Sequence, residues 1–242
     1  MPSLIEGRSE GRSEDRSGDR GEGRAGGGAW GRVAALAAVL VVLAGGAGAW
    51  LWLRGGADEV APGTYRAERS TELYAPIASR ELDPRPLSEA EVLGPATATV
   101  EAAGTAMVRR SASLAADCAA VVHGAAAEAL AGCTQVLRAV YASRDGSVSG
   151  QFLLFNMADA EAADALVAAL DPASGKGFAR LAPEQPDSFD AARSWAQARA
   201  LGHFVTLSWV GPVGDERPNL TGPQLALDGL GRALQQRVVD AE

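Results

Sequence analysis

The two cysteines are the residues whose type and spacing indicate a definite chemistry. Cys118 and Cys133 are the only cysteines of the chain, and an even pair favours a disulfide in a domain outside the cytoplasm. The alanine-rich stretch 117–131 predicts a helix interrupted at Gly124. One unbroken helix would hold the two cysteines about 20 Å apart, whereas a disulfide requires Cα atoms about 6 Å apart. A bridge therefore requires a late helix start or a break at Gly124. Two separate buried thiols are the alternative, and a metal site is disfavoured because His123 is the only nearby histidine.

Two short motifs resemble known functional signatures, but each lacks a required residue. Gly175-Lys176-Gly177 resembles a phosphate-binding loop, which needs a glycine five positions before the Gly-Lys pair and Ser or Thr after the lysine. Those positions hold Leu170 and Gly177. The stretch 146–150 resembles a nucleophile elbow, but its central residue is Val148 where serine is required. Neither motif predicts a site.

The remaining candidates for catalysis are histidines and carboxylates. His123 and His203 are the only histidines. His203 opens a predicted strand and could act as a general base, although a histidine there is more often a surface or capping residue. The carboxylates fall on predicted loops and solvated helix faces. The sequence therefore predicts no catalytic residue, no cofactor-binding residue, no metal ligand and no cofactor, and it does not favour an enzyme.

The charge distribution excludes two classes of partner. The formal net charge is −8. Residues 1–32 carry six arginines and six acidic residues, so the excess lies from Arg54 onward, with 16 basic and 24 acidic residues. A net-acidic domain lacks the basic surface of a nucleic-acid-binding protein, and it is not attracted to an anionic lipid surface.

A single uncharged apolar segment predicts a membrane-spanning helix over 33–53. Its 21 residues reach roughly 30 Å as a helix, which matches the hydrocarbon thickness of a bilayer. Trp50 and Trp52 lie at its outer end, where indole side chains favour the membrane–water boundary. The lipid bilayer is therefore the predicted partner of this segment. The alternative is a cleaved signal peptide, with the small residues 47–49 as its cleavage site.

Residues 1–32 are predicted to form a disordered, charged cytoplasmic tail. Arginines recur every four residues from Arg8 to Arg24, but five glycines from Gly7 to Gly23 are interspersed with them and no apolar face exists. Within about 20 residues of the apolar segment, four arginines lie on its inner side and three on its outer side. This slight bias predicts a cytoplasmic N-terminus and an extracytoplasmic C-terminal domain in the cell membrane.

The rest of the chain predicts a tether followed by one α+β domain. Residues 54–87 contain four prolines and read as a Pro-containing tether; the domain is assigned to 88–242. Within it, hydropathy patterns predict two strand-strand-helix units, at 134–142, 148–157 and 159–170, then at 192–200, 203–210 and from Thr221 onward. We therefore expect a four-stranded antiparallel sheet with helices packed on one face. Residues 97–100 would supply a fifth, edge strand.

One sequence resemblance adds to this expectation. The residues Asp117-Cys118 and Gly132-Cys133-Thr134-Gln135-Val136-Leu137-Arg138-Ala139-Val140-Tyr141 follow a charged leader and an apolar segment. This arrangement resembles a group of actinobacterial single-pass membrane proteins with a cysteine-containing extracytoplasmic domain. The likeness extends from Leu87 to the last predicted helix. It implies a topology and a source, but the group has no characterised activity that could be carried over.

The sequence thus predicts a membrane-anchored extracytoplasmic module that binds, senses or scaffolds and is not catalytic. Two alternatives stay open. The first is a secreted domain released by cleavage of a signal peptide, and the second is an envelope enzyme whose residues are too scattered to be recognised.

Overall fold

The computed structural model describes residues 60–174 and 177–241. The predicted tail (1–32) and the predicted membrane span (33–53) lie outside these residues. Within the described ranges, the helices are all too short or too polar to cross a bilayer.

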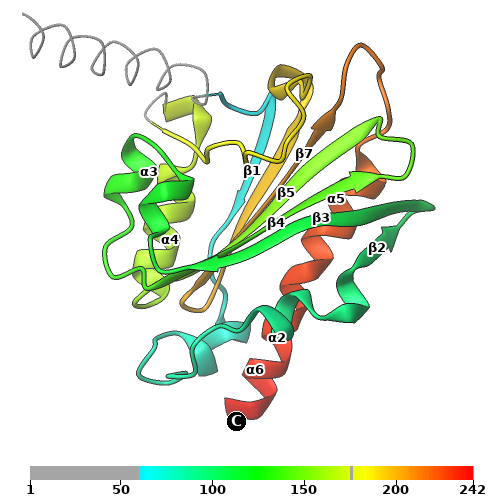
Figure 1. Cartoon of the computed structure of the whole chain (residues 1–242). Helices are drawn as coiled ribbons and strands as arrows, with labels where there is room; N and C mark the ends of the chain where they lie inside the picture. Colours follow the sequence, from blue (N-terminus) through cyan, green and yellow to red (C-terminus); the bar gives the residue numbers. More distant parts are fainter. Residues whose placement is uncertain (1–59, 175–176, 242) are drawn as a thin grey trace, which may run out of the picture. The chain divides into compact units, whose positions relative to one another are not determined.

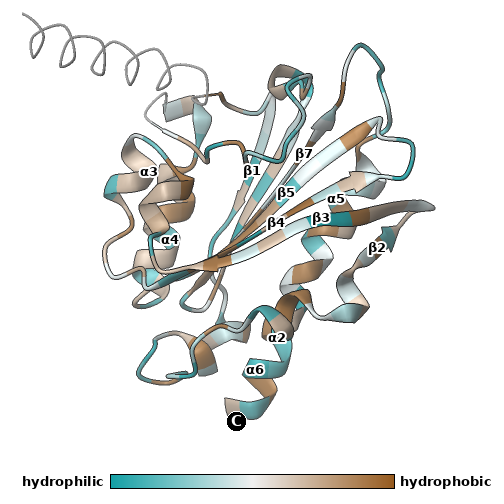
Figure 2. Cartoon of the chain, viewed as in Figure 1, coloured by the Kyte–Doolittle hydropathy of each residue, from teal (hydrophilic) through white to brown (hydrophobic). Residues whose placement is uncertain are grey.

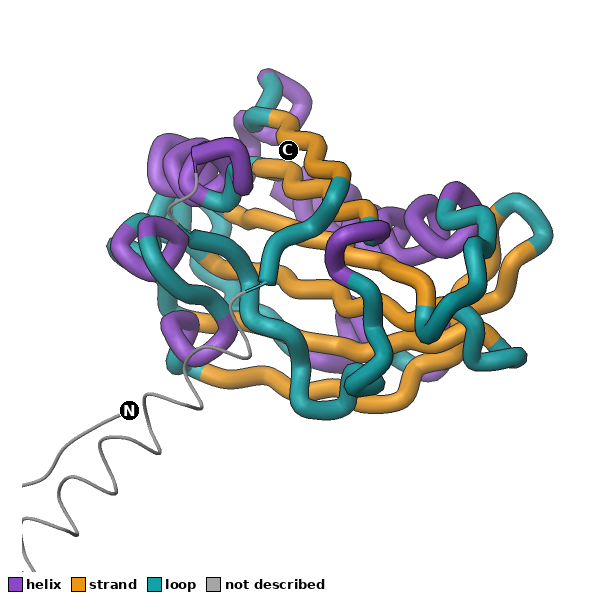
Figure 3. The backbone as a smooth tube through the Cα atoms, turned by 90° about the horizontal axis from the view of Figure 1, so that it is seen from above, coloured by secondary structure: helices purple, strands orange, loops and turns teal. Residues whose placement is uncertain are grey.

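The domain is built on a curled, mixed sheet of seven strands within the described residues. Their order across the sheet is β1-β6-β7-β5-β4-β3-β2. All neighbours are antiparallel except β1 and β6, which are parallel. Figures 1 and 3 show that the sheet curves like half of a barrel. The strands are β1 (Thr64–Glu68), β2 (Thr99–Ala102), β3 (Thr105–Ala115), β4 (Gln135–Ser143), β5 (Val148–Asn156), β6 (Trp195–Leu201) and β7 (Phe204–Pro212).

Short helices cover both faces of this sheet. One face carries α3 and α4, and the other carries α2, α5 and α6 (Figure 1). The α-helices are α2 (Glu89–Leu93), α3 (Ala125–Glu128), α4 (Ala160–Ala169), α5 (Thr221–Asp228) and α6 (Ala233–Ala241). The 3-10 helices used below are η1 (Glu72–Ile77), η2 (Pro95–Thr97), η3 (Cys118–Val121), η5 (Ala191–Arg193) and η6 (Gly229–Arg232).

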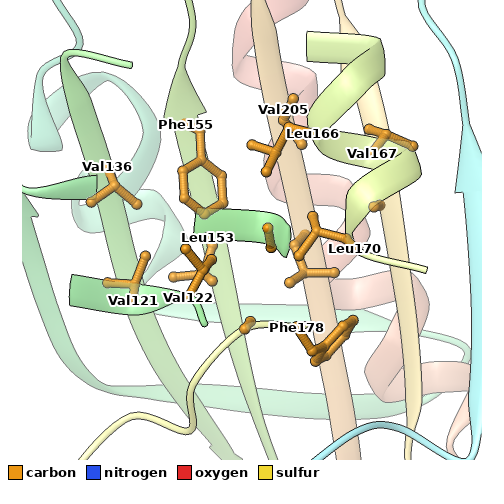
Figure 4. Packing of buried hydrophobic residues seen from close by; sticks show 14 of the residues in the cluster. Val121, Val122, Val136, Leu153, Phe155, Leu166, Val167, Leu170, Phe178 and Val205 are labelled. Carbon is orange, nitrogen blue, oxygen red and sulfur yellow. The ribbon is translucent and has the colours of Figure 1, made fainter. Parts of the chain in front are cut away.

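The core consists of two apolar layers, one on each face of the sheet. Every residue of β5 and β7 is buried, and alternate side chains enter opposite layers because successive residues of a strand point to opposite faces. Leu153 and Phe155 pack with α4, as Figure 4 shows, whereas Phe152 and Leu154 pack with α5 and α6. In Figure 2 the apolar colour is accordingly concentrated on the central strands and on the helices beside them.

The predicted sheet of four to five antiparallel strands with helices on one face is wrong. Its four central strands exist, but the sheet has seven strands, one pair is parallel, and helices lie on both faces. The additional strands β1, β2 and most of β3 lie at the sheet edges, where residues are largely exposed or half-exposed. Such strands lack the alternating apolar pattern from which a strand is recognised in a sequence.

The predicted helix over 117–131 is present only as two short helices, η3 and α3, but its predicted break at Gly124 and the predicted disulfide are both confirmed. Gly124 adopts φ 60° and ψ −142°, a conformation that favours glycine. The chain reverses there, between the short helices η3 and α3. The Cα atoms of Cys118 and Cys133 are consequently 6.4 Å apart and the two side chains form a disulfide.

The described part of the predicted tether belongs to the fold. β1 pairs with β6 from Thr64 to Glu68, and Ile77, Asp83 and Leu87 are buried. The domain therefore begins well before residue 88. This segment escaped prediction because its prolines and scattered charges resemble a linker, while its pairing partner is more than 100 residues away in the sequence.

A buried ion network holds this early segment against the C-terminal helix. The Arg237 guanidinium of α6, only 2% exposed, lies 2.8 Å from a carboxylate oxygen of Asp83 and 2.6 Å from one of Glu91. It also donates to the carbonyl oxygens of Arg85 and Pro86, at 2.8 and 2.9 Å. Its donors are thus matched by acceptors from residues 83–91, as a buried charge requires.

Candidate functional site

The sequence candidates do not form a catalytic site. His203 lies in the turn between β6 and β7, fully buried, with Nδ1 2.9 Å from the Ile77 carbonyl oxygen. Burial lowers the pKa of His203, although the hydrogen bond with the Ile77 carbonyl and the charge of Asp83 act to raise it. His123 lies elsewhere, where its backbone N–H donates to the Phe178 carbonyl. Over residues 60–174 and 177–241, no group of three or more His, Cys, Asp or Glu residues is placed to hold a metal ion.

Of the two rejected motifs, the structure describes the stretch 146–150. Residues 146–150 form the end of the β4–β5 hairpin, where Asp145 accepts hydrogen bonds from Ser143 and Ser147. These bonds lower the pKa of Asp145 to about 2, with the Ser143 hydroxyl contributing most. They stabilise a turn and prepare no nucleophile. Gly175 and Lys176 lie outside the described residues.

The best candidate site is a groove of about 630 Å³ beside α5 and η6. Its floor contains Arg199 of β6, Thr206 of β7 and Asp228 at the end of α5. One wall is β2, and the opposite rim includes Tyr74, with Arg232 and Gln235 from the C-terminal helices. The volume lies within the range of roughly 300–1,000 Å³ that is typical of small-ligand sites. Below, "the groove" means this site.

A chain of ion pairs and hydrogen bonds fixes the floor of the groove. Arg199 bridges two carboxylates: its Nε lies 3.1 Å from Glu68 of β1, and its Nη2 lies 2.9 Å from Asp228. Glu68 also accepts from Gln197 at 2.9 Å, and Ser208 donates to Asp228 at 3.3 Å. The floor is therefore organised in advance by residues from β1, β6, β7 and α5.

The electrostatics of the floor are balanced. Burial raises the pKa of Asp228, and the charge of Arg199 and the hydroxyl of Ser208 oppose this shift. Arg199 in turn is compensated by two carboxylates. The charged residues that line the groove are two arginines, Arg199 and Arg232, and two acids, Glu101 and Asp228, so the groove gives little attraction to a strongly charged ligand and suits a largely neutral one.

The groove presents polar and apolar side chains to a ligand, and the buried Ser208 lies outside its lining. Ser208 contacts Asp228 directly, and its hydroxyl also accepts a hydrogen bond from Gln224 at 2.9 Å. No histidine, cysteine or lysine is among the residues that line the groove in the described part of the chain. A serine nucleophile needs an adjacent base, and here its neighbours are a paired carboxylate and an amide.

A second depression of about 500 Å³ lies between η1 and α4. Five alanines contribute to its lining, and Asp164, its nearest acidic group, accepts a hydrogen bond from the Ser70 backbone N–H. Small side chains and an already engaged carboxylate offer few contacts to a ligand, so this depression is the weaker candidate.

Comparison of the chain with family models, with curated proteins and with solved structures finds no match. The resemblance to actinobacterial single-pass membrane proteins therefore stays a prediction, and the function must be argued from the geometry of the domain.

Sequence reasoning missed the groove because its residues come from eight separate elements. Two signals pointed towards it. Gly229 and Gly231 interrupt the apolar pattern of the final helix, and the helix is indeed divided there into α5, η6 and α6. Polar residues also alternate on the inner face of two strands predicted as buried, at Gln197, Arg199, Thr206 and Ser208.

Proposed function

We propose that this protein is a membrane-anchored extracytoplasmic binding module that takes its ligand in the groove. The observation that supports the proposal is the pre-organised polar floor formed by Arg199, Asp228 and Thr206. Polar groups that converge in a concave site are typical of ligand binding. The Cys118–Cys133 disulfide supports the extracytoplasmic placement, because disulfides persist in oxidising compartments.

The groove can be tested with a variant that fills it without straining the fold. Gly229 lines the groove with φ −60°, and a Cβ built on it has no atom within 4 Å. A Gly229→Trp variant therefore occupies the groove and leaves the backbone unchanged. Val239→Trp is the matched control, since Val239 of α6 is 64% exposed and lies outside the groove.

The experiment is a thermal-shift screen of the full-length chain in lipid nanodiscs against a panel of sugars, amino acids, peptides and nucleosides. A compound that stabilises the wild type and the Val239→Trp variant, but not the Gly229→Trp variant, supports the groove. A compound that stabilises all three proteins equally binds elsewhere and contradicts the proposal.

The anchor needs its own measurement, namely intact mass of the chain from the native membrane fraction. The full-length mass in that fraction, with both thiols protected from alkylation until reduction, supports the proposed topology. A chain that begins near Trp50 and appears in the medium would show that the domain is secreted.

A further inference from the structure

Four consecutive residues of β2, Thr99–Ala102, line the groove. Side chains of a strand alternate between two faces. Val100 and Ala102 pack with the inner apolar layer, so Thr99 and Glu101 point to the other face. Residues of both faces border one groove only if the edge of the strand, with its backbone groups, lies along it.

The hydrogen-bond pattern shows which backbone groups are directed towards the groove. Ala98 accepts a bond from the Arg109 backbone N–H at 2.9 Å, and Val100 and Ala102 lie opposite Met107 and Thr105 of β3. In an antiparallel pair, residues that bond to the partner alternate with residues that do not. Since Ala98, Val100 and Ala102 bond to β3, the N–H and C=O of Thr99 and Glu101 point away from it.

These outward groups are available for binding. β2 is the last strand of the sheet, and both Thr99 and Glu101 are exposed. None of the turn, loop and capping backbone bonds among the described residues involves Thr99 or Glu101. Two N–H donors and two C=O acceptors therefore face the groove, in the arrangement that an added strand requires.

The surface beside this edge fits an extended chain. An added strand lies about 4.8 Å from its neighbour, which places it over the outer side of α5 and η6. There Leu225 is 51% exposed, and the position of Gly229 is open on the groove side. Alternate side chains of the added strand would meet Leu225 and the partly buried Val100, while the others would face solvent next to Glu101.

We propose that the groove binds an extended peptide segment of another protein, which adds to the sheet as a strand beside β2. This inference rests on the proposed function, because it specifies the ligand of the same groove. A partner protein is favoured over a second copy because residues beyond the edge strand, Arg199 and Leu201 of β6 among them, also line the groove. A narrow segment fits such a channel, whereas the edge strand of a second folded domain would bring its neighbouring strands with it.

The test uses a variant that removes one outward donor, with a control for the side-chain charge that is lost with it. Glu101→Pro deletes the N–H that points into the groove and keeps the β2–β3 bonds, and proline is tolerated at such edge positions. Glu101→Thr is the matched control, since it removes the same charge and keeps the N–H. Both variants should melt within a few degrees of the wild type.

The probe is a random dodecapeptide library, displayed on phage and selected against the full-length chain in nanodiscs. We expect selected peptides to bind the Glu101→Pro variant more than tenfold more weakly than the wild type, and the Glu101→Thr variant within threefold. The amide signals of Thr99 and Glu101 should shift downfield on binding. Equal affinity for the wild type and both Glu101 variants would overturn strand addition.

The outcomes separate this inference from the proposed function. If Gly229→Trp abolishes peptide binding and Glu101→Pro does not, the groove is the binding site but strand addition is wrong. If neither variant affects binding, or no peptide is selected while other compounds bind the groove, the peptide proposal fails. A wild-type dimer that Glu101→Pro dissociates would identify a second copy as the occupant and also overturn the proposal.

Discussion

Replacement of Arg237 by methionine should destabilise the domain strongly, because the change leaves the buried Asp83 carboxylate without its main partner. Arg237 and Asp83 are 2% and 3% exposed. Removal of one member of a buried ion pair typically costs about 3–5 kcal/mol. Arg85 still lies 3.3 Å from Asp83, so the lower end, about 3 kcal/mol, is expected. For a domain of this size, that loss lowers the melting temperature by about 6–12 °C.

The assay is chemical unfolding of the full-length chain in detergent, followed by tryptophan fluorescence. Arg85→Met is the control in the same network, since Arg85 is half exposed and its loss should have a much smaller effect. The double variant Asp83→Leu/Arg237→Met should recover much of the lost stability, because no unpaired charge is then left at Asp83. A loss below about 1 kcal/mol for Arg237→Met would refute this reasoning.

Three further predictions concern other parts of the domain. Replacement of Cys118 and Cys133 by alanine opens a loop with a sequence separation of 15 and should cost about 3 kcal/mol of unfolding free energy. Burial lowers the pKa of His203 below its usual 6.5, so His203 binds a proton more readily in the unfolded chain than in the folded one. The free energy of unfolding should therefore fall as the pH drops below about 6.5. The variant His203→Gln should show a weaker dependence of stability on pH. Gly150→Ala should cost about 1–3 kcal/mol, because the added Cβ would lie 2.7 Å from a valine of β7, whereas Gly229→Ala should gain about 0.5–1 kcal/mol.

Each of these predictions has an outcome that contradicts it. An alanine double variant as stable as the wild type would mean that the disulfide does not constrain the unfolded chain. An identical pH dependence for the wild type and His203→Gln would assign that dependence to other groups. If Gly150→Ala and Gly229→Ala have the same effect, the close approach of α5 to the sheet at Gly150 is not a steric limit.

The central elements could be predicted from the sequence because their patterns are dominated by burial. Runs of large apolar residues, such as Phe152 to Phe155, occur in the hairpins β4–β5 and β6–β7 and in the helix α4. Such runs are buried only when these elements lie at the centre of the fold. The stretch 117–131 is helical over only two short segments for the opposite reason. Alanine has a high helix propensity but buries little surface, so the disulfide and the backbone of Gly124 decide the local structure.

The edge strand β1 and the groove could not be predicted because they depend on contacts between distant segments, whereas β2 overlaps the edge strand predicted over 97–100. β1 is a strand only because β6 pairs with it, and Glu68 has a role only because Arg199 lies opposite. The binding role proposed for the two outward residues of β2 likewise depends on Leu225 and Gly229, which lie in helices more than 100 residues later. Local patterns carry no information on such pairings.

The early position of β1 in the chain limits the distance between the domain and the predicted membrane span. If residues 33–53 span the membrane, as proposed, only residues 54–59 separate the span from Val60, the first described residue. Six residues reach at most about 20 Å when fully extended, whereas the predicted tether over 54–87 would have reached about 110 Å. The domain would then stay close to the bilayer surface. Any protein segment that it binds must therefore come within a few nanometres of the membrane.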